Sequence, residues 1–67
     1  MITLTINGDE REFSDEMAVS SLLDELGLGE KPVVVELNRQ ALSPSEFESQ
    51  ILKNGDELEI ITIAAGG

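Results

Sequence analysis

The stretch IITIAAGG, residues 60–67, joins a run of β-branched residues to two consecutive glycines. Isoleucine and threonine favour extended strands, so we expect a strand that ends near Ile63. Glycine has no Cβ and is the thinnest backbone that a chain can present. Fully extended, the four residues after Ile63 reach about 13 Å at most. The stretch therefore predicts a folded domain over residues 1–63 and a flexible Gly-Gly tail over residues 64–67.

The residues that lead into this tail alternate in polarity. Residues 57–60 place glutamates on one side of a strand and aliphatic side chains on the other, because successive side chains face opposite sides. Ile61 and Ile63 share the side of the glutamates, so the strand becomes apolar on both faces. Such a strand is either covered on both faces or binds a partner. The predicted docking face consists of Ile61, Ile63 and Val34, with Thr3 and Thr5 beside them and Glu57 and Glu59 at its rim.

A second interpretation of the same residues stays open. β-branched residues have high strand propensity, so they also fit a sheet face that binds nothing.

The N-terminal segment predicts a hairpin. Residues 2–6 alternate between aliphatic residues and threonine, which is typical of a half-buried strand, and Asn7-Gly8 favours a tight turn. Residues 10–13 form the expected return strand, with Phe13 in the core. The polar residues 14–16 are then expected to end the hairpin and to cap a helix.

The helix itself is predicted by four apolar residues on one face. Their spacing of i, i+3, i+4 and i+7 is that of an amphipathic helix, whereas the intervening residues 20–21 and 24–25 are polar. Gly27 suits the left-handed position just beyond a helix end. The four apolar residues are Val19, Leu22, Leu23 and Leu26.

The second half of the chain predicts three further strands and a short helix. Residues 33–37 suit an interior strand, residues 38–40 a turn and residues 41–42 a short edge strand. A capping box from Ser43 to Glu46, with proline at the first helical position, starts a helix of one or two turns. Its inward residues are expected to be Phe47, Ile51 and Leu52, and residues 54–56 form a turn before the last strand.

This element order describes an α+β fold. A hairpin, a crossover helix and later strands give a mixed sheet of four to five strands with one main helix and a short second helix. A right-handed crossover places the last strand beside the first, in the middle of the sheet. This arrangement is the ubiquitin-like β-grasp.

Composition excludes several classes of function. The chain has no cysteine, histidine, tyrosine or tryptophan, which removes the usual nucleophiles and the general base near neutral pH.

The net charge of −10 opposes binding to nucleic acid and to anionic membranes and favours a basic protein partner. We expect no resident metal, because the acidic residues around Asp9 follow a turn and are typical of a solvated surface. The N-terminus carries no signal-like segment, so we expect a cytoplasmic protein. We also expect the free chain to be a monomer.

At this point the whole chain resembles the ubiquitin-like β-grasp sulfur carriers, and most closely those of thiamine biosynthesis. The resemblance combines several segments that are weak individually and more specific in this order. They are the strand that ends in Asn7-Gly8, VSSLLDELG at 19–27, VVVELN at 33–38, NGDELEI at 54–60 and the glycines at 66–67.

The resemblance implies a carrier and not an enzyme. In this family a ubiquitin-activating-like adenylating enzyme uses ATP and magnesium to convert the terminal carboxylate into an acyl-adenylate. A sulfur donor fed by a cysteine desulfurase then replaces AMP, and the thiocarboxylate passes sulfur to thiazole synthase. On this sequence the modified residue is Gly67, and Gly66, Ala65 and Ala64 form the slender segment that enters the enzyme. The chain itself is expected to bind no cofactor.

Three further interpretations of the sequence remain open. The small subunit of molybdopterin synthase also ends in Gly-Gly and carries a thiocarboxylate, although its family tends to be longer. A protein modifier joined to lysines would use the same carboxyl group. A ubiquitin-like interaction module would not use the glycines at all.

Overall fold

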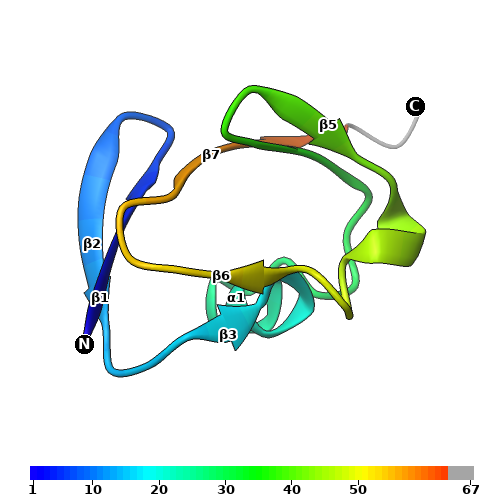
Figure 1. The fold of residues 1–67 in the computed structure, drawn as a ribbon. Coiled ribbons are helices and arrows are strands. Elements are labelled where there is room, and N and C mark those ends of the chain that lie inside the picture. Colours follow the sequence, from blue (N-terminus) through cyan, green and yellow to red (C-terminus); the bar gives the residue numbers. More distant parts are fainter. Residues whose placement is uncertain (64–67) are drawn as a thin grey trace.

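A computed structural model describes residues 1–63. The predicted tail, residues 64–67, lies outside the described residues. The described chain forms a main sheet, one α-helix, a single 3-10 turn and a second, two-stranded sheet (Figure 1). None of the helices in this part of the chain has the length and apolar character needed to cross a membrane.

Five strands form the main sheet, which is mixed as predicted. Their bounds are Ile2–Ile6 for β1, Asp9–Phe13 for β2, Val33–Leu37 for β4, Gln40–Leu42 for β5 and Glu57–Thr62 for β7. The order across the sheet is β2-β1-β7-β4-β5. β1 and β7 run parallel, and the other neighbouring pairs are antiparallel. The last strand therefore lies in the middle of the sheet, between β1 and β4, which confirms the prediction.

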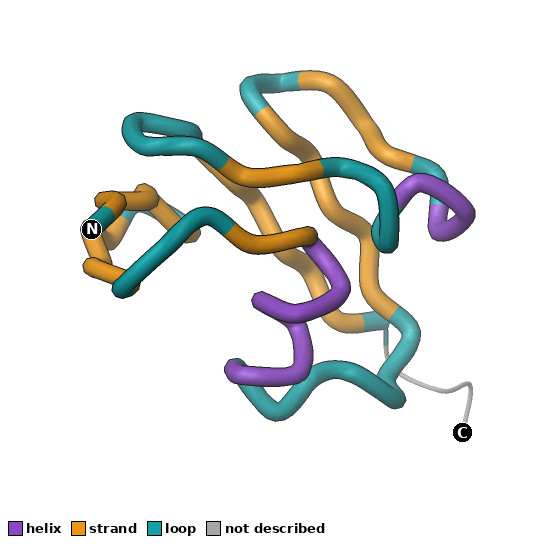
Figure 2. The backbone as a smooth tube through the Cα atoms, turned by 60° about the horizontal axis from the view of Figure 1, so that its bottom comes forward, coloured by secondary structure: helices purple, strands orange, loops and turns teal. Residues whose placement is uncertain are grey.

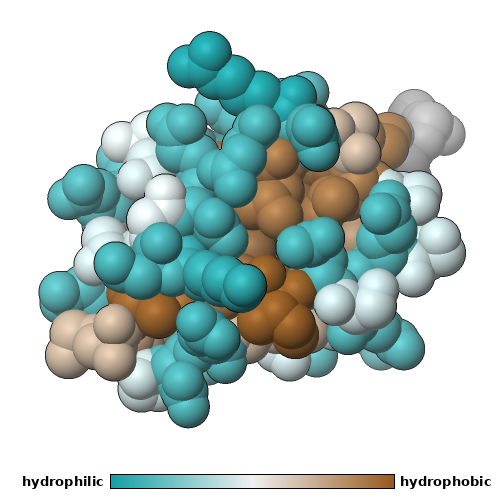
Figure 3. Space-filling view, in the orientation of Figure 1, coloured by the Kyte–Doolittle hydropathy of each residue, from teal (hydrophilic) through white to brown (hydrophobic). Residues whose placement is uncertain are grey.

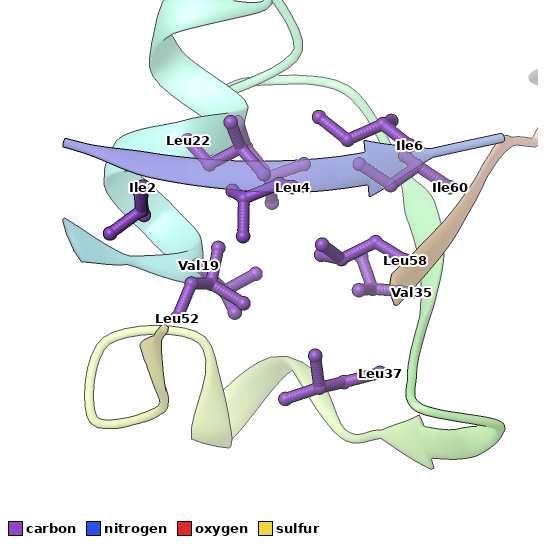
Figure 4. Packing of buried hydrophobic residues seen from close by; sticks show 11 residues of the cluster. Ile2, Leu4, Ile6, Val19, Leu22, Val35, Leu37, Leu52, Leu58 and Ile60 are labelled. Atoms are coloured by element: carbon purple, nitrogen blue, oxygen red, sulfur yellow. The ribbon is translucent and has the colours of Figure 1, made fainter. Parts of the chain in front are cut away.

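The core lies between this sheet and the helix α1, Val19–Glu25 (Figure 2). Side chains from β1, α1, β4, β7 and a short strand, β6 (Ile51–Leu52), point into one space (Figure 4). Leu4, Leu22 and Val35 are completely buried there, and no polar or charged residue within residues 1–63 is buried. Burial of an aliphatic side chain contributes about 1.5–3 kcal/mol relative to exposure, so this apolar layer is the main source of stability.

Two hairpin turns use the left-handed backbone region. Asn7 and Gly8 have φ values of 51° and 87°, and Asn38 and Arg39 have φ values of 49° and 71°. Two consecutive positive φ values match the twist of the flanking strands. The turn predicted from Asn7-Gly8 is confirmed, and so is the turn that follows β4.

The N-terminal end of α1 departs from the sequence prediction, whereas its C-terminal end does not. The polar residues 14–16 do not cap the helix, because the N-cap is Ala18 and it makes no side-chain cap. Backbone carbonyls of a distant loop take this role: the Val19 N–H donates to Gln50 (3.0 Å) and the Ser20 N–H to Phe47 (2.9 Å). The C-terminal end agrees with the prediction. Gly27, at φ 77°, follows the helix as its left-handed residue.

A small second sheet was not predicted. It pairs β3, Met17–Ala18, with β6, Ile51–Leu52, in antiparallel fashion. Alternation within β6 buries Leu52 and leaves Ile51 41% exposed. The prediction that Ile51 points inward is therefore wrong, because that residue belongs to a strand and not to the face of a helix.

The expected second helix is a single 3-10 turn, η1, Pro44–Glu46. Its capping box is present as predicted. The Glu46 carboxylate accepts hydrogen bonds from the backbone N–H of Ser43 (2.9 Å) and from the Ser43 hydroxyl (3.0 Å). Phe47 follows the turn and packs, partly buried, against the core.

Candidate functional site

The predicted docking residues lie on the face of the main sheet opposite to α1. Ile61 of β7 stands directly across from Val34 of β4 in the antiparallel register. Ile61 is 57% exposed, Ile63 51% and Val34 40%. Large aliphatic side chains with this exposure contribute little to the core. The structure therefore brings Ile61 and Val34 together as predicted, and we call Val34, Ile61 and Ile63 the apolar patch.

The same sheet face is acidic at its other end. Glu36 of β4 stands directly opposite Glu59 of β7, and Glu57 is the first residue of β7. These three glutamates are exposed, and with Arg39 and Thr5 they line a hollow of about 160 Å³. Glu57 and Glu59 thus border the apolar patch on one side only. We call Glu36, Glu57 and Glu59 the acidic patch.

The prediction that Thr3 and Thr5 lie beside Ile61 is wrong. In the parallel register, Thr5 of β1 is opposite Glu57 of β7. Glu57 and Ile61 are four positions apart along the strand, about 13 Å at the usual rise. The two threonines therefore belong to the acidic end of the face, where β2 adds Glu10 and Glu12 opposite them.

The space-filling view shows that polarity is unevenly distributed over the molecular surface. In Figure 3, which has the orientation of Figure 1, apolar surface gathers in the middle of the visible face, between hydrophilic groups. Most of the remaining surface in this view is hydrophilic, as the net charge of −10 leads one to expect.

Two asparagine side chains hold β7, and sequence reasoning did not identify them. At the Asn7 turn, the amide Nδ2 donates to the Ile60 carbonyl (3.0 Å) and Oδ1 accepts from the Ile60 N–H (2.7 Å). At the other turn, Asn38 Oδ1 accepts from the Glu57 N–H (3.0 Å) and Nδ2 donates to Asp56 Oδ1 (3.1 Å). The sequence signalled both turns, but it carried no signal of what the side chains bind.

Within residues 1–63 no group of three or more histidine, cysteine, aspartate or glutamate residues is placed to hold a metal ion. One carboxyl group there has a clearly shifted pKa. The backbone and side-chain hydrogen bonds from Ser43 lower the pKa of Glu46 below its ordinary value. That group lies in η1 and serves the capping box.

The comparison with protein families distinguishes the thiamine sulfur carriers from the small subunit of molybdopterin synthase. The model of the ThiS family matches residues 4–67, which is nearly the whole chain and includes both terminal glycines. The chain belongs to the ThiS family. ThiS proteins are sulfur carriers for thiamine biosynthesis and act as protein cosubstrates, not as enzymes. This confirms the family resemblance and favours the thiamine carriers over the molybdopterin synthase subunit.

Two curated relatives of the ThiS-family chain differ greatly in length. The chain is 42% identical over 64 residues to a thiazole synthase of Paramagnetospirillum magneticum, matching with 96% of its own length but spanning only 20% of that protein. It is 38% identical over 66 residues to the uncharacterized protein ycf40 of Pyropia yezoensis, covering 98% of the chain and 93% of that protein.

Solved structures of a ThiS protein share the fold. The crystal structure of the thiamine biosynthesis protein ThiS from Geobacter metallireducens superposes with a TM-score of 0.84 at 30% identity, covering 98% of this chain and all of that one. A solution NMR structure of a thiamine biosynthesis protein from the same organism gives a TM-score of 0.81 at 30% identity, covering 98% and 88% of the two chains. The β-grasp prediction is therefore confirmed.

The residues expected to carry the chemistry lie outside the described part of the chain. They are Gly67, Gly66, Ala65 and Ala64. Their roles are taken up below as a proposal.

Proposed function

We propose that the sulfur-carrying group is the carboxylate of Gly67. The observation that carries this proposal is the family match, which extends through Gly67 in a family of sulfur carriers. The position of β7 supports it. The segment that leads into the tail is the central strand of the sheet, paired to β4 along residues 58–62. A tail that continues from a central strand starts from a firmly held point.

The chemistry follows from the reactivity of a carboxyl group. A free α-carboxylate is ionised at neutral pH and resists attack by nucleophiles. A partner adenylating enzyme of the ubiquitin-activating type would use ATP and magnesium to form a glycyl-adenylate at Gly67, with release of pyrophosphate. A sulfur nucleophile from a donor fed by a cysteine desulfurase would then form the C–S bond as the C–O bond to AMP breaks. Attack by a donor persulfide would give an acyl disulfide on Gly67. A thiol would then cleave its S–S bond, which leaves a thiocarboxylate on Gly67 and a disulfide between that thiol and the donor cysteine.

The acceptor of this sulfur is proposed to be thiazole synthase. The support is the thiazole synthase of Paramagnetospirillum magneticum, which contains a segment 42% identical to this chain. A carrier segment within the same polypeptide as the synthase is consistent with transfer between the two. The carrier itself needs no bound cofactor for any of these steps, because ATP and magnesium are bound by the partner.

The tail residues are proposed to act by their small size. Gly66 has no side chain, and Ala65 and Ala64 each carry only a methyl group, so the segment fits a narrow channel. A bulky residue at any of the three positions is expected to hinder entry without changing the fold. The adenylation of Gly67 depends on this access.

The apolar patch is proposed to dock the adenylating enzyme. Val34, Ile61 and Ile63 are exposed, although burial of such side chains is favourable, and they lie where the tail begins. The acidic patch beside it complements a basic partner surface. Opposite charges raise association rates more than they raise affinity, and salt screens this effect.

The acidity of the chain also opposes contact with nucleic acid and with membranes. We further propose that the carrier is cytoplasmic, because the adenylation step needs ATP, and that it is a monomer when free.

The direct test is the mass of the intact protein after incubation with the adenylating enzyme, ATP, magnesium and a sulfur source. The expected result is a gain equal to the replacement of one oxygen by sulfur, located on the C-terminal peptide. Location is essential, since oxidation of Met1 or Met17 adds nearly the same mass. A gain found elsewhere in the chain would overturn the proposal.

Matched controls separate a sulfur carrier from a protein modifier and from an interaction module. A chain without Gly67 and a chain extended by one residue keep all described elements but should neither be adenylated nor gain sulfur. A protein modifier would instead form an amide with lysine, which has a different mass. An interaction module would keep its affinity and its function without Gly67, whereas a carrier without Gly67 would lose all sulfur transfer.

A further inference from the structure

Direct pairing between β1 and β7 is short. The register contains two residue pairs, Thr5 with Glu57 and Ile6 with Leu58. β1 ends at Ile6, whereas β7 continues to Thr62. On the side of β1, the last part of β7 is therefore not covered by a strand in the described chain.

The uncovered edge of β7 carries backbone N–H and carbonyl groups that face β1 and need hydrogen-bond partners. The N–H of Asn7 donates to the Leu58 carbonyl (2.9 Å), so the polar groups of Leu58 face β1. Backbone groups of alternate residues face the same side of a strand, and the groups of Ile60 and Thr62 point that way as well. Ile60 is buried, and polar groups near the core that lack partners are costly.

The side chain of Asn7 supplies the missing partner. Its amide binds both the N–H and the carbonyl of Ile60, at 2.7 Å and 3.0 Å, in a partly buried position. The left-handed backbone at Asn7 turns the main chain away into the hairpin, while the side chain continues along β7. The amide thus acts as one further residue of β1. Asn38 makes comparable contacts at the opposite end of β7, where its Oδ1 accepts from the Glu57 N–H.

We propose that Asn7 is a positioning residue for the sulfur-carrying tail. Its amide keeps Ile60 in the sheet and so sets the place and direction in which the chain leaves the fold. Beyond Ile60, pairing to β4 remains on the other side, and the Ile63 N–H donates to the Pro32 carbonyl (2.9 Å). Asn38 holds the start of β7, far from the tail, and has no such effect. The positioning role rests on the proposed function, whereas the clamp on Ile60 does not.

The clamp is tested by hydrogen exchange on two glycine variants. Asn7→Gly and Asn38→Gly both keep a residue that accepts positive φ and remove only the amide. In Asn7→Gly the protection of the Ile60 amide should fall about tenfold beyond any global loss, the size expected for one hydrogen-bonded group. In Asn38→Gly the Glu57 amide should show this local loss and Ile60 should not. Equal losses at both amides in both variants would overturn the clamp.

The effect on the tail is tested by the kinetics of adenylation, at a temperature where both variants are folded. Asn7→Gly should raise the KM of the adenylating enzyme for the carrier several-fold more than Asn38→Gly, because fewer molecules present the tail correctly. Equal KM values would overturn the positioning role. If the unsubstituted chain is not adenylated, the proposed function fails and the positioning role with it, while hydrogen exchange still decides the clamp.

A conservative variant covers the case in which the glycine variant does not fold. Asn7→Asp keeps an oxygen that accepts from the Ile60 N–H but loses the donor to the Ile60 carbonyl. Its protection at Ile60 should lie between that of the unsubstituted chain and that of an unclamped strand. Unchanged protection and unchanged KM in this variant would contradict the role given to the donor.

Discussion

The two faces of the main sheet differ although the same strands build them. On the side of α1, Leu58 and Ile60 of β7 are buried in an apolar layer. On the other side, Glu59 and Ile61 of the same strand are exposed. One face thus combines with α1 to hold the fold, and the other carries charges and aliphatic groups that the fold does not use.

This difference indicates where stability and binding can be changed separately. A substitution on the inner face leaves a cavity in a close-packed interior, so it acts on folding. A substitution on the outer face meets solvent and acts on folding weakly. The clearest support for this difference would therefore be a large loss of stability from a substitution on the inner face of β7 and a small loss from one on its outer face.

The largest effect is expected from Leu58→Ala. Leu58 is almost completely buried, and a leucine-to-alanine change in a core costs about 2–5 kcal/mol. The control is Ile61→Ala on the outer face of the same strand, which should stay within about 0.5 kcal/mol. Denaturant unfolding of both variants measures the difference. Similar losses in both would remove the distinction between the faces.

The next effect concerns binding. Ile61→Asp should weaken binding to the adenylating enzyme about tenfold or more, because a charge replaces an aliphatic side chain that is worth about 1.5–3 kcal/mol when buried. The fold should survive, since Ile61 is 57% exposed.

A matched control for this change lies in the small sheet. Ile51 is 41% exposed in β6, outside the apolar patch, so Ile51→Asp introduces the same charge elsewhere. Binding can be followed by titration calorimetry. Unfolding of the Ile61 variant, or equal binding losses in both variants, would leave the apolar patch as an ordinary sheet face.

A smaller effect is expected within the acidic patch. Glu36 and Glu59 stand directly opposite each other, and like charges in such a pair are destabilising by about 0.2–1 kcal/mol. Glu59→Gln should therefore raise stability at low salt, and the gain should shrink as salt screens the repulsion. The same variant should associate more slowly with a basic partner. Glu48→Gln serves as a control, because Glu48 is exposed and lies outside the sheet. A loss of stability in Glu59→Gln would contradict the repulsion.

The smallest effect is a pH dependence from Glu46. Hydrogen bonds from Ser43 lower its pKa in the folded state below the ordinary 4.5. A lowered folded-state pKa means that the capping box contributes stability above pH 4.5, and that this contribution is lost as the pH falls through the lowered pKa. The stability difference between the unsubstituted chain and Glu46→Gln should therefore narrow on acidification. A stability difference that stays constant with pH would contradict the lowered pKa of Glu46 in the folded state.

Local sequence patterns predicted much of this fold. The turn at Asn7-Gly8, the apolar face of α1, the left-handed Gly27 and the alternation along β7 depend on neighbouring residues, so they are visible in the sequence. The central place of β7 followed from connection rules for sheets. The exposed positions of Val34 and Ile61 followed from the same alternation.

Features that depend on distant contacts were missed. α1 starts at Val19 because carbonyls near residue 50 accept its first N–H groups, and no local cap signals this. Ile51 was placed inward because its pairing with Ala18 was unknown. Thr5 was placed beside Ile61 because the register of β1 against β7 cannot be deduced from either strand alone. The amide contacts of Asn7 join turn and strand across the whole chain.

The pairing of β1 with β7 has a consequence for synthesis of the protein. β1 leaves the ribosome before the other strands of this domain, and its parallel neighbour is the last of them to follow. Contacts between such distant segments form slowly, because a long loop must close first. The nascent chain therefore cannot complete its sheet until residues 57–62 have emerged, and the hairpin of β1 and β2 waits with one edge uncovered. A truncated translation product that ends before residue 57 would remain without the central strand of its sheet.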